Sequence, residues 1–315
     1  MEAIPVLDLG DFTNGDPSRV KKFVQALGES FTNTGFVVIK GHSLSEELRL
    51  EMYDQINSFF DLSQSQKDAY IAPGLAGQRG YTAFGQEHAK DASTPDLKEF
   101  WQFGQKVTKE IEDHPSFPKN IHVEELPMFN PLGMKTFKTL ESIGADIMRA
   151  LALFLNLEED YFDSHITCGN SILRAIHYPG LSKDPGDALR SSPHEDINLI
   201  TLLMGASSKG LEILTRENTW LPVVAGEGEL VVNIGDMVQR LTNGQLPSTT
   251  HRVSNPSGED FSTSRYSLPF FLHPRPEMPL NVLEQCVSED RPVQFKNITA
   301  GEYLTQRLRE IGLIK

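Results

Sequence analysis

The strongest constraint on the fold is a change of sequence texture near Ser171. From there, seven short runs rich in β-branched and aromatic residues follow one another, and glycine or Asn-Gly turns separate them. The runs are SILRAIHY, NLITLLM, LEILT, ELVVNIG, MVQRLTN, THRVSN and SRYSLPFFL. Many short strands with turn signals between them are typical of a β-sandwich or a jelly-roll barrel. The sequence therefore predicts a β-rich core in the second half of the chain.

The first half of the chain predicts helices around this core. Three segments carry apolar residues at helical spacing. The first opens at Asp16-Pro17 and ends at Gly35, after which residues 36–39 predict a strand. Ser43 and Glu46 form a capping-box pattern ahead of the second. The three apolar faces are Val20, Phe23, Val24, Leu27 and Phe31; Leu48, Met52, Ile56, Phe59 and Phe60; and Phe137, Leu140, Ile147, Met148, Leu151 and Phe154.

A long segment between the second and third helices lacks this periodicity. Residues 70–130 are rich in glycine and proline, which indicates a partly irregular region. Such a region can form one wall of a ligand pocket. We therefore take Arg79, Tyr81, Phe84 and Trp101 as candidate substrate contacts.

The net charge of −14 at pH 7 restricts the partners of this chain. An acidic protein repels a phosphate backbone, and no run of Lys and Arg with interleaved aromatic residues offsets that charge, so we expect no nucleic-acid partner. The opening MEAIPVLDLGDF carries acidic residues and no long apolar stretch, so we expect neither a secretory signal nor a membrane anchor. The only cysteines, Cys168 and Cys286, fit reduced thiols in the cytoplasm.

Three residues could together bind a metal ion. His194 and Asp196 are two positions apart in SPHEDINLITLLM, so on an extended strand they share one face and Glu195 points away. This pair alone is equally compatible with a surface turn. His251, in THRVSN, follows a connection that can return the chain beside the pair. Two imidazoles and one carboxylate on one face of an octahedral ion leave three positions open, as in non-haem iron(II) oxygenases.

Arg265 and Ser267 in SRYSLPFF repeat the same i, i+2 arrangement. On a strand this places a guanidinium group and a hydroxyl group side by side. Arg offers a bidentate fork to a carboxylate and Ser adds one donor, so the pair is a candidate anchor for an anionic ligand. The alternative is an Arg that pairs with an internal Asp or Glu.

Several co-linear motifs resemble those of one enzyme family. HEDINLITLL, NIGDMVQRLTNG, HRVSNP and RYSLPFF are similar to the core of the 2-oxoglutarate-dependent oxygenases related to isopenicillin N synthase. GFVVIKGH, FFDLSQSQK, RGYTAFGQE and DLKEFW resemble the N-terminal region of the same family. The likeness extends over most of the chain, and the motifs are specific as a set although each is weak alone.

The resemblance implies a double-stranded β-helix (jelly-roll, cupin-like) core, with flanking helices and a helical N-terminal region. It implies an N-terminal region over residues 1–120, an oxygenase core with its long supporting helix over 121–290 and a C-terminal helix within 291–315. In that last part, Thr299 and Glu302 again have capping-box spacing.

The resemblance also implies functions for individual residues. Iron(II) would bind to His194, Asp196 and His251. Arg265 and Ser267 would hold the distal carboxylate of 2-oxoglutarate, with help from Tyr178. Phe271 lies where some members present an aromatic ring to the substrate, and a plain core phenylalanine is an equal alternative at this position.

The function expected from the resemblance is hydroxylation, desaturation or cyclisation of a small organic metabolite. Iron(II), 2-oxoglutarate and O2 would take part, succinate and CO2 would be released, and ascorbate would reactivate the iron. We expect a monomer or a weak homodimer. Three alternatives stay open: an oxidase of the isopenicillin N synthase type that uses O2 without 2-oxoglutarate, a metabolite-binding homologue without turnover, and a zinc hydrolase.

Overall fold

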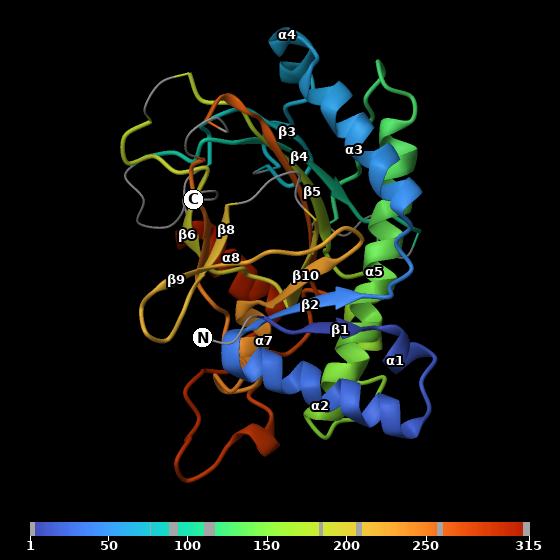
Figure 1. Ribbon diagram of the computed structural model, residues 1–315, viewed down its shortest axis with the longest axis vertical. Coiled ribbons are helices and arrows are strands. Elements are labelled where there is room, and N and C mark those ends of the chain that lie inside the picture. The colour runs from blue at the N-terminus through green and yellow to red at the C-terminus, as the bar shows by residue number, and fades with distance from the viewer. Residues whose placement is uncertain are drawn as a thin grey trace.

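Two β-sheets form the centre of the structure, a computed structural model that describes residues 4–75, 77–87, 94–109, 117–182, 185–205, 210–256 and 261–310 (Figure 1). The larger sheet has the strand order β1-β2-β10-β7-β12-β5-β4-β3, and the smaller has the order β6-β11-β8-β9. The larger sheet contains β1 (Val6–Asp8), β2 (Phe36–Lys40), β10 (Leu230–Ile234), β7 (Ile200–Met204), β12 (Arg265–Leu272), β5 (Ile172–Tyr178), β4 (Glu99–Gly104) and β3 (Gly80–Thr82). The smaller contains β6 (Ser191–His194), β11 (His251–Val253), β8 (Leu211–Leu214) and β9 (Trp220–Pro222).

Three long helices pack on one side of the larger sheet: α2 (Pro17–Thr34), α3 (Glu46–Phe60) and α5 (Phe129–Phe154) (Figure 1). The shorter helices are α1 (Gly10–Thr13), α4 (Gln64–Asp68), α6 (Asp163–Ile166), α7 (Asp236–Leu241), the 3-10 turn η2 (Glu284–Cys286) and α8 (Ala300–Glu310). The predicted mainly β fold with flanking helices is confirmed. No helix in the described part of the chain is long and apolar enough to cross a membrane.

The predicted start and end of α2 are confirmed. The Asp16 carboxylate accepts hydrogen bonds from the backbone N–H groups of Ser18 and Arg19, at 2.9 and 3.1 Å, and Pro17 occupies the first turn. Gly35 ends the helix at φ = 71°, a left-handed conformation that glycine adopts without steric cost. The chain then continues directly into β2.

Two local predictions are wrong. MVQRLTN forms α7 instead of a strand, because Met237, Val238 and Leu241 bury one helical face in the core. In α3 the N-cap is Ser45, whose hydroxyl accepts a hydrogen bond from the N–H of Leu48, whereas the capping-box pattern pointed to Ser43. Short apolar runs occur in helices and in strands, and Ser43 and Ser45 can each act as an N-cap. The sequence alone therefore does not decide either case.

The side chains of β12 face alternately the core and the cavity that lies between the sheets. Leu268, Phe270 and Leu272 are buried in the core, and the rings of Phe270 and Phe137 of α5 lie 5.0 Å apart. The intervening residues of β12 face the other way and line the cavity. The long helix α5 therefore packs against one face of this strand, and the other face lines the cavity.

Two glycines of α5 provide a matched test of this packing. A Cβ at Gly133 would lie 2.4 Å from the ring of buried Phe103, whereas a Cβ at Gly144 would lie 3.2 Å from Leu272. We expect Gly133→Ala to lower the free energy of unfolding by about 1–3 kcal/mol, because a buried ring must move. Gly144→Ala should stay within about 1 kcal/mol of the original, because alanine favours a helix. Urea denaturation measures both, and equal midpoints would contradict this packing.

Candidate metal centre

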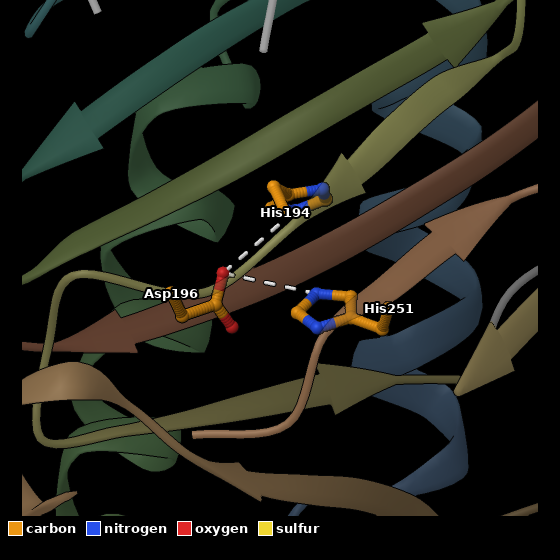
Figure 2. Close-up of side chains that lie close together, drawn as sticks. All are labelled: His194, Asp196 and His251. Carbon is orange, nitrogen blue, oxygen red and sulfur yellow. Dashed lines mark ion pairs between the residues drawn. The ribbon is translucent and has the colours of Figure 1, made fainter. Parts of the chain in front are cut away.

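His194, Asp196 and His251 meet at one point of the cavity, between the two sheets (Figure 2). His194 ends β6 and His251 begins β11, and the two are directly paired in the antiparallel register. The Asp196 Oδ1 atom lies 3.9 Å from Nε2 of His194 and 3.8 Å from Nε2 of His251. All three potential ligand atoms lie within 4.8 Å of one another. A single divalent ion can therefore reach all three.

Backbone contacts fix which nitrogen of each histidine faces this point. The Nδ1 atom of His194 lies 2.8 Å from the carbonyl oxygen of Ser192, and that of His251 lies 3.1 Å from the carbonyl oxygen of Thr249. A carbonyl oxygen only accepts, so each Nδ1 carries the proton. Each Nε2 then presents a lone pair toward Asp196, which is the arrangement of a metal-binding imidazole.

The Asp196 carboxylate is oriented from the larger sheet. Its Oδ2 atom accepts hydrogen bonds from the Thr201 hydroxyl at 2.6 Å and from the Asn233 amide at 2.8 Å. The N–H of Asp236 donates to the Asp196 backbone carbonyl at 2.7 Å. The two hydrogen bonds to Oδ2 occupy that oxygen and leave Oδ1 facing the two histidines.

Electrostatics also change the pKa values of His194 and Asp196. Burial, and then the neighbouring His251, lower the pKa of His194 to about 4, so this imidazole is neutral at pH 7. Burial alone would raise the pKa of Asp196, but His251 and His194 together with the bonds from Asn233 and Thr201 hold it below its ordinary value. Two imidazoles and one carboxylate form a donor set that fits iron(II) and leaves coordination positions free.

The cavity beside these ligands has a volume of about 280 Å³. Arg265 and Ser267 of β12 and Tyr178 of β5 all line it, so the structure brings together the three residues expected to anchor a carboxylate. Arg265 and Tyr178 are paired across the two strands, and the guanidinium carbon lies 5.0 Å from the centre of the Tyr178 ring. Phe271 lines the cavity farther along β12.

Buried and partly buried charged side chains line another part of the wall. Arg174 donates through Nη1 to Glu87 at 3.0 Å, and Lys98 contacts Glu87 at 2.9 Å and Asp96 at 2.8 Å. Burial alone would raise the pKa of Glu87, but Arg174 and Lys98 lower it to about 2. Two cations and two carboxylates thus balance one another within this group.

The four residues expected in the pocket wall lie outside the cavity lining. Trp101 and Tyr81 are partners in the β3–β4 register, and both pack against Phe59, with ring centres 4.9 and 6.0 Å from it. Arg79 is buried and donates to the backbone carbonyls of its neighbours in the loops, and Phe84 is 46% exposed. Side chains alternate along β4, so the neighbour of Trp101, Gln102, is the residue that lines the cavity.

Sequence reasoning missed several residues of the site. Thr201 and Asn233 orient Asp196, and Arg174 and Gln102 line the cavity. Thr201 and Asn233 lie within HEDINLITLL and NIGDMVQRLTNG, but nothing in those motifs singled them out as partners of Asp196. Arg174 could have been found, because strand alternation in LRAIHY places it on the same face as Tyr178. The α8 residues Leu304, Arg307 and Leu308 also reach the cavity, and no local signal in the sequence indicates that contact.

Comparisons with known proteins agree with this geometry. Residues 4–125 match the family model of the N-terminal region of the non-haem dioxygenases described from morphine synthesis, and residues 169–274 match that of the 2OG-Fe(II) oxygenase superfamily. A 2-oxoglutarate-Fe(II) type oxidoreductase of Aspergillus fumigatus is 32% identical, covering 97% of this chain and 92% of that protein.

Two solved structures are also similar to the whole chain. A 2OG-Fe(II) oxygenase family protein of Caulobacter crescentus is 39% identical at a TM-score of 0.89 and covers 99% of this chain and 100% of that one. A Neurospora crassa protein, solved in complex with alpha-KG and thymine, is 27% identical at a TM-score of 0.85 and covers 97% and 96% of the two chains. The chain therefore belongs to the 2OG-Fe(II) oxygenase superfamily, as an oxygenase that depends on iron(II) and 2-oxoglutarate and acts on small molecules.

Proposed function

We propose that His194, Asp196 and His251 bind the iron(II) ion of this oxygenase. The observation that carries the proposal is that three ligand atoms converge while the other polar atom of each side chain is already hydrogen-bonded. Both Nδ1 atoms are held by backbone carbonyls, and Asp196 Oδ2 is held by Thr201 and Asn233. Only the two Nε2 atoms and Oδ1 then remain for an ion.

Arg265, Ser267 and Tyr178 form the proposed site for the distal carboxylate of 2-oxoglutarate. Arg265 is buried and lies on the same strand face as Ser267, so a guanidinium fork and a hydroxyl donor meet one carboxylate. The Tyr178 ring makes a cation–π contact with the Arg265 guanidinium group. These residues bind and orient the co-substrate, and the burial of the site excludes water from it.

The bound iron, 2-oxoglutarate and O2 supply the oxidation: 2-oxoglutarate loses CO2 and gives succinate with one oxygen atom, and the second oxygen atom serves to oxidise a C–H bond of the substrate. Hydroxylation is the outcome that we propose. Phe271 presents its ring to the substrate beside the ligands, because its partner across the strands, Thr201, contacts Asp196. The Arg174 guanidinium carbon lies 5.4 Å from the centre of that ring. Since the Neurospora crassa protein was solved with thymine, a small uncharged ring compound is the proposed type of substrate.

The iron ligands can be tested directly. We expect Asp196→Ala to abolish stoichiometric Fe(II) binding in anaerobic calorimetry, because the only carboxylate among the three ligands is lost. Glu195→Gln is the matched control, since the Glu195 carboxylate contacts Thr250 instead. Retained Fe(II) affinity in the Asp196 variant would place the carboxylate ligand elsewhere.

The hydrogen bonds to Asp196 allow a second test. Asn233→Leu removes the amide that holds Oδ2, so Fe(II) affinity should fall roughly tenfold to hundredfold while the stoichiometry stays the same. Asn130→Leu serves as the control, because Asn130 is also buried and hydrogen-bonded but lies away from the cavity. Equal Fe(II) affinities of the two variants would show that the Asn233 contact does not orient the ligand.

The carboxylate anchor predicts a separate effect. Arg265→Gln should raise the 2-oxoglutarate concentration for half-maximal succinate formation roughly tenfold to hundredfold, because a charged hydrogen-bond donor is lost. Fe(II) affinity should be unchanged. Arg252→Gln is the control, because Arg252 pairs with Glu212 outside the cavity lining. An unaltered requirement for 2-oxoglutarate in the Arg265 variant would refute this anchor.

A further inference from the structure

Two buried polar side chains of the cavity wall have atoms without a hydrogen-bond partner. Asn170 is 5% exposed and His273 is 9% exposed, and both line the cavity. Within the described residues, the Asn170 Oδ1 and His273 Nδ1 atoms find no partner. Buried polar atoms that remain unsatisfied are costly and uncommon, so each of them requires an explanation.

The backbone around the two residues is firmly connected. Asn170 lies just before β5 and His273 just after β12, and these strands pair antiparallel. The N–H of His273 donates to the Ser171 hydroxyl at 3.1 Å, and the N–H of Asn170 lies 3.4 Å from the carbonyl oxygen of Pro274. A loosely placed loop therefore does not account for the unpartnered atoms.

Their position relates them to the proposed site of oxidation. Phe271 lies two residues before His273, which follows directly after β12, so the two are about 7 Å apart along the chain, and both line the cavity. Thr201, the cross-strand partner of Phe271, contacts the Asp196 carboxylate. A molecule seated on the Phe271 ring therefore lies within reach of Asn170 and His273 on one side and next to the metal ligands.

The chemistry of the two groups selects the partner. Asn170 Oδ1 is an acceptor and needs an N–H or O–H group. Burial lowers the pKa of His273 to about 4, so its ring is neutral at pH 7 and offers one donor and one acceptor. The charged residues nearby, Arg174, Lys98, Glu87 and Asp96, already balance one another. An uncharged ligand with adjacent donor and acceptor groups fits this part of the wall.

We propose that Asn170 and His273 form a substrate-recognition subsite that hydrogen-bonds an uncharged amide-type group, –CO–NH–, of a planar substrate lying on Phe271. The proposal rests on the proposed function, since it concerns the same cavity. The two residues would determine which substrate binds, and this binding can be measured without iron and 2-oxoglutarate.

The experiment compares apolar replacements of similar shape. Ligand-observed NMR titrations at pH 7 would use the full chain without iron and 2-oxoglutarate. The probes are three neutral cyclic amides, uracil, 2-pyridone and hydantoin, and two comparison compounds, toluene and orotate. We expect at least one of the amides to bind the original protein. Asn170→Leu and His273→Phe should each weaken the binding of that amide tenfold or more. Toluene should bind these variants at least as well as the original protein. Orotate should bind the original protein more weakly than uracil.

Thermal unfolding provides the second measurement. Replacing an unpartnered buried polar group with an apolar one should leave the melting temperature unchanged or raise it, as expected for a residue kept for function. The controls Asn130→Leu and His177→Phe remove fully bonded groups, so they should lower the melting temperature and leave amide binding unchanged.

Three results would overturn the subsite: no cyclic amide binds the original protein, the amides bind the variants equally well, or Asn170→Leu and His273→Phe destabilise the fold as the controls do. Succinate formation from 2-oxoglutarate without substrate, measured on the iron-loaded original protein, keeps the two proposals apart. Turnover that persists while the amides fail to bind would reject the subsite alone. Loss of both succinate formation and amide binding would reject the proposed function as well.

Discussion

The Asp196 carboxylate is the point at which the two sheets are connected chemically. The smaller sheet supplies the two histidines, which its antiparallel register sets opposite each other. The larger sheet supplies Thr201 and Asn233, which hold one oxygen of Asp196. Each sheet alone would present an incomplete set of ligands or an unoriented carboxylate. The site therefore depends on correct packing of both sheets, and the long helices behind the larger sheet keep that packing rigid.

Buried charge in the cavity is arranged in separate groups with different consequences. The proposed metal ligands are two imidazoles and one carboxylate, a set whose negative charge an iron(II) ion can neutralise. The group of Arg174, Lys98, Glu87 and Asp96 is balanced within itself. Such ion pairs cost free energy when they are desolvated, so they are poor sources of stability. Their value here is to fix the shape and polarity of the wall.

The sequence was most informative where a residue pattern has a strict geometric meaning. The spacing of His194 and Asp196, the cap at Asp16 and the strand character of SRYSLPFFL all predicted what the structure contains. It was least informative where the choice depends on packing between distant segments. Trp101 and Gln102 occupy opposite faces of β4, and only the aromatic cluster around Phe59 decides which face meets the cavity. Asn233 begins the motif NIGDMVQRLTNG, yet its contact with Asp196, like the contact of α8 with the cavity, depends on how distant segments pack.

β12 carries Arg265 and Ser267 near one end and Phe271 near the other, and His273 follows directly after the strand. The proposed co-substrate and substrate contacts thus follow one another along the same strand face, at intervals of two residues. Substitutions at the far end can redirect the enzyme to new compounds without touching the chemistry that drives oxidation. A single inserted or deleted residue would instead turn every later side chain to the opposite face. New specificities on this scaffold should therefore arise by exchange of residues and not by changes in strand length.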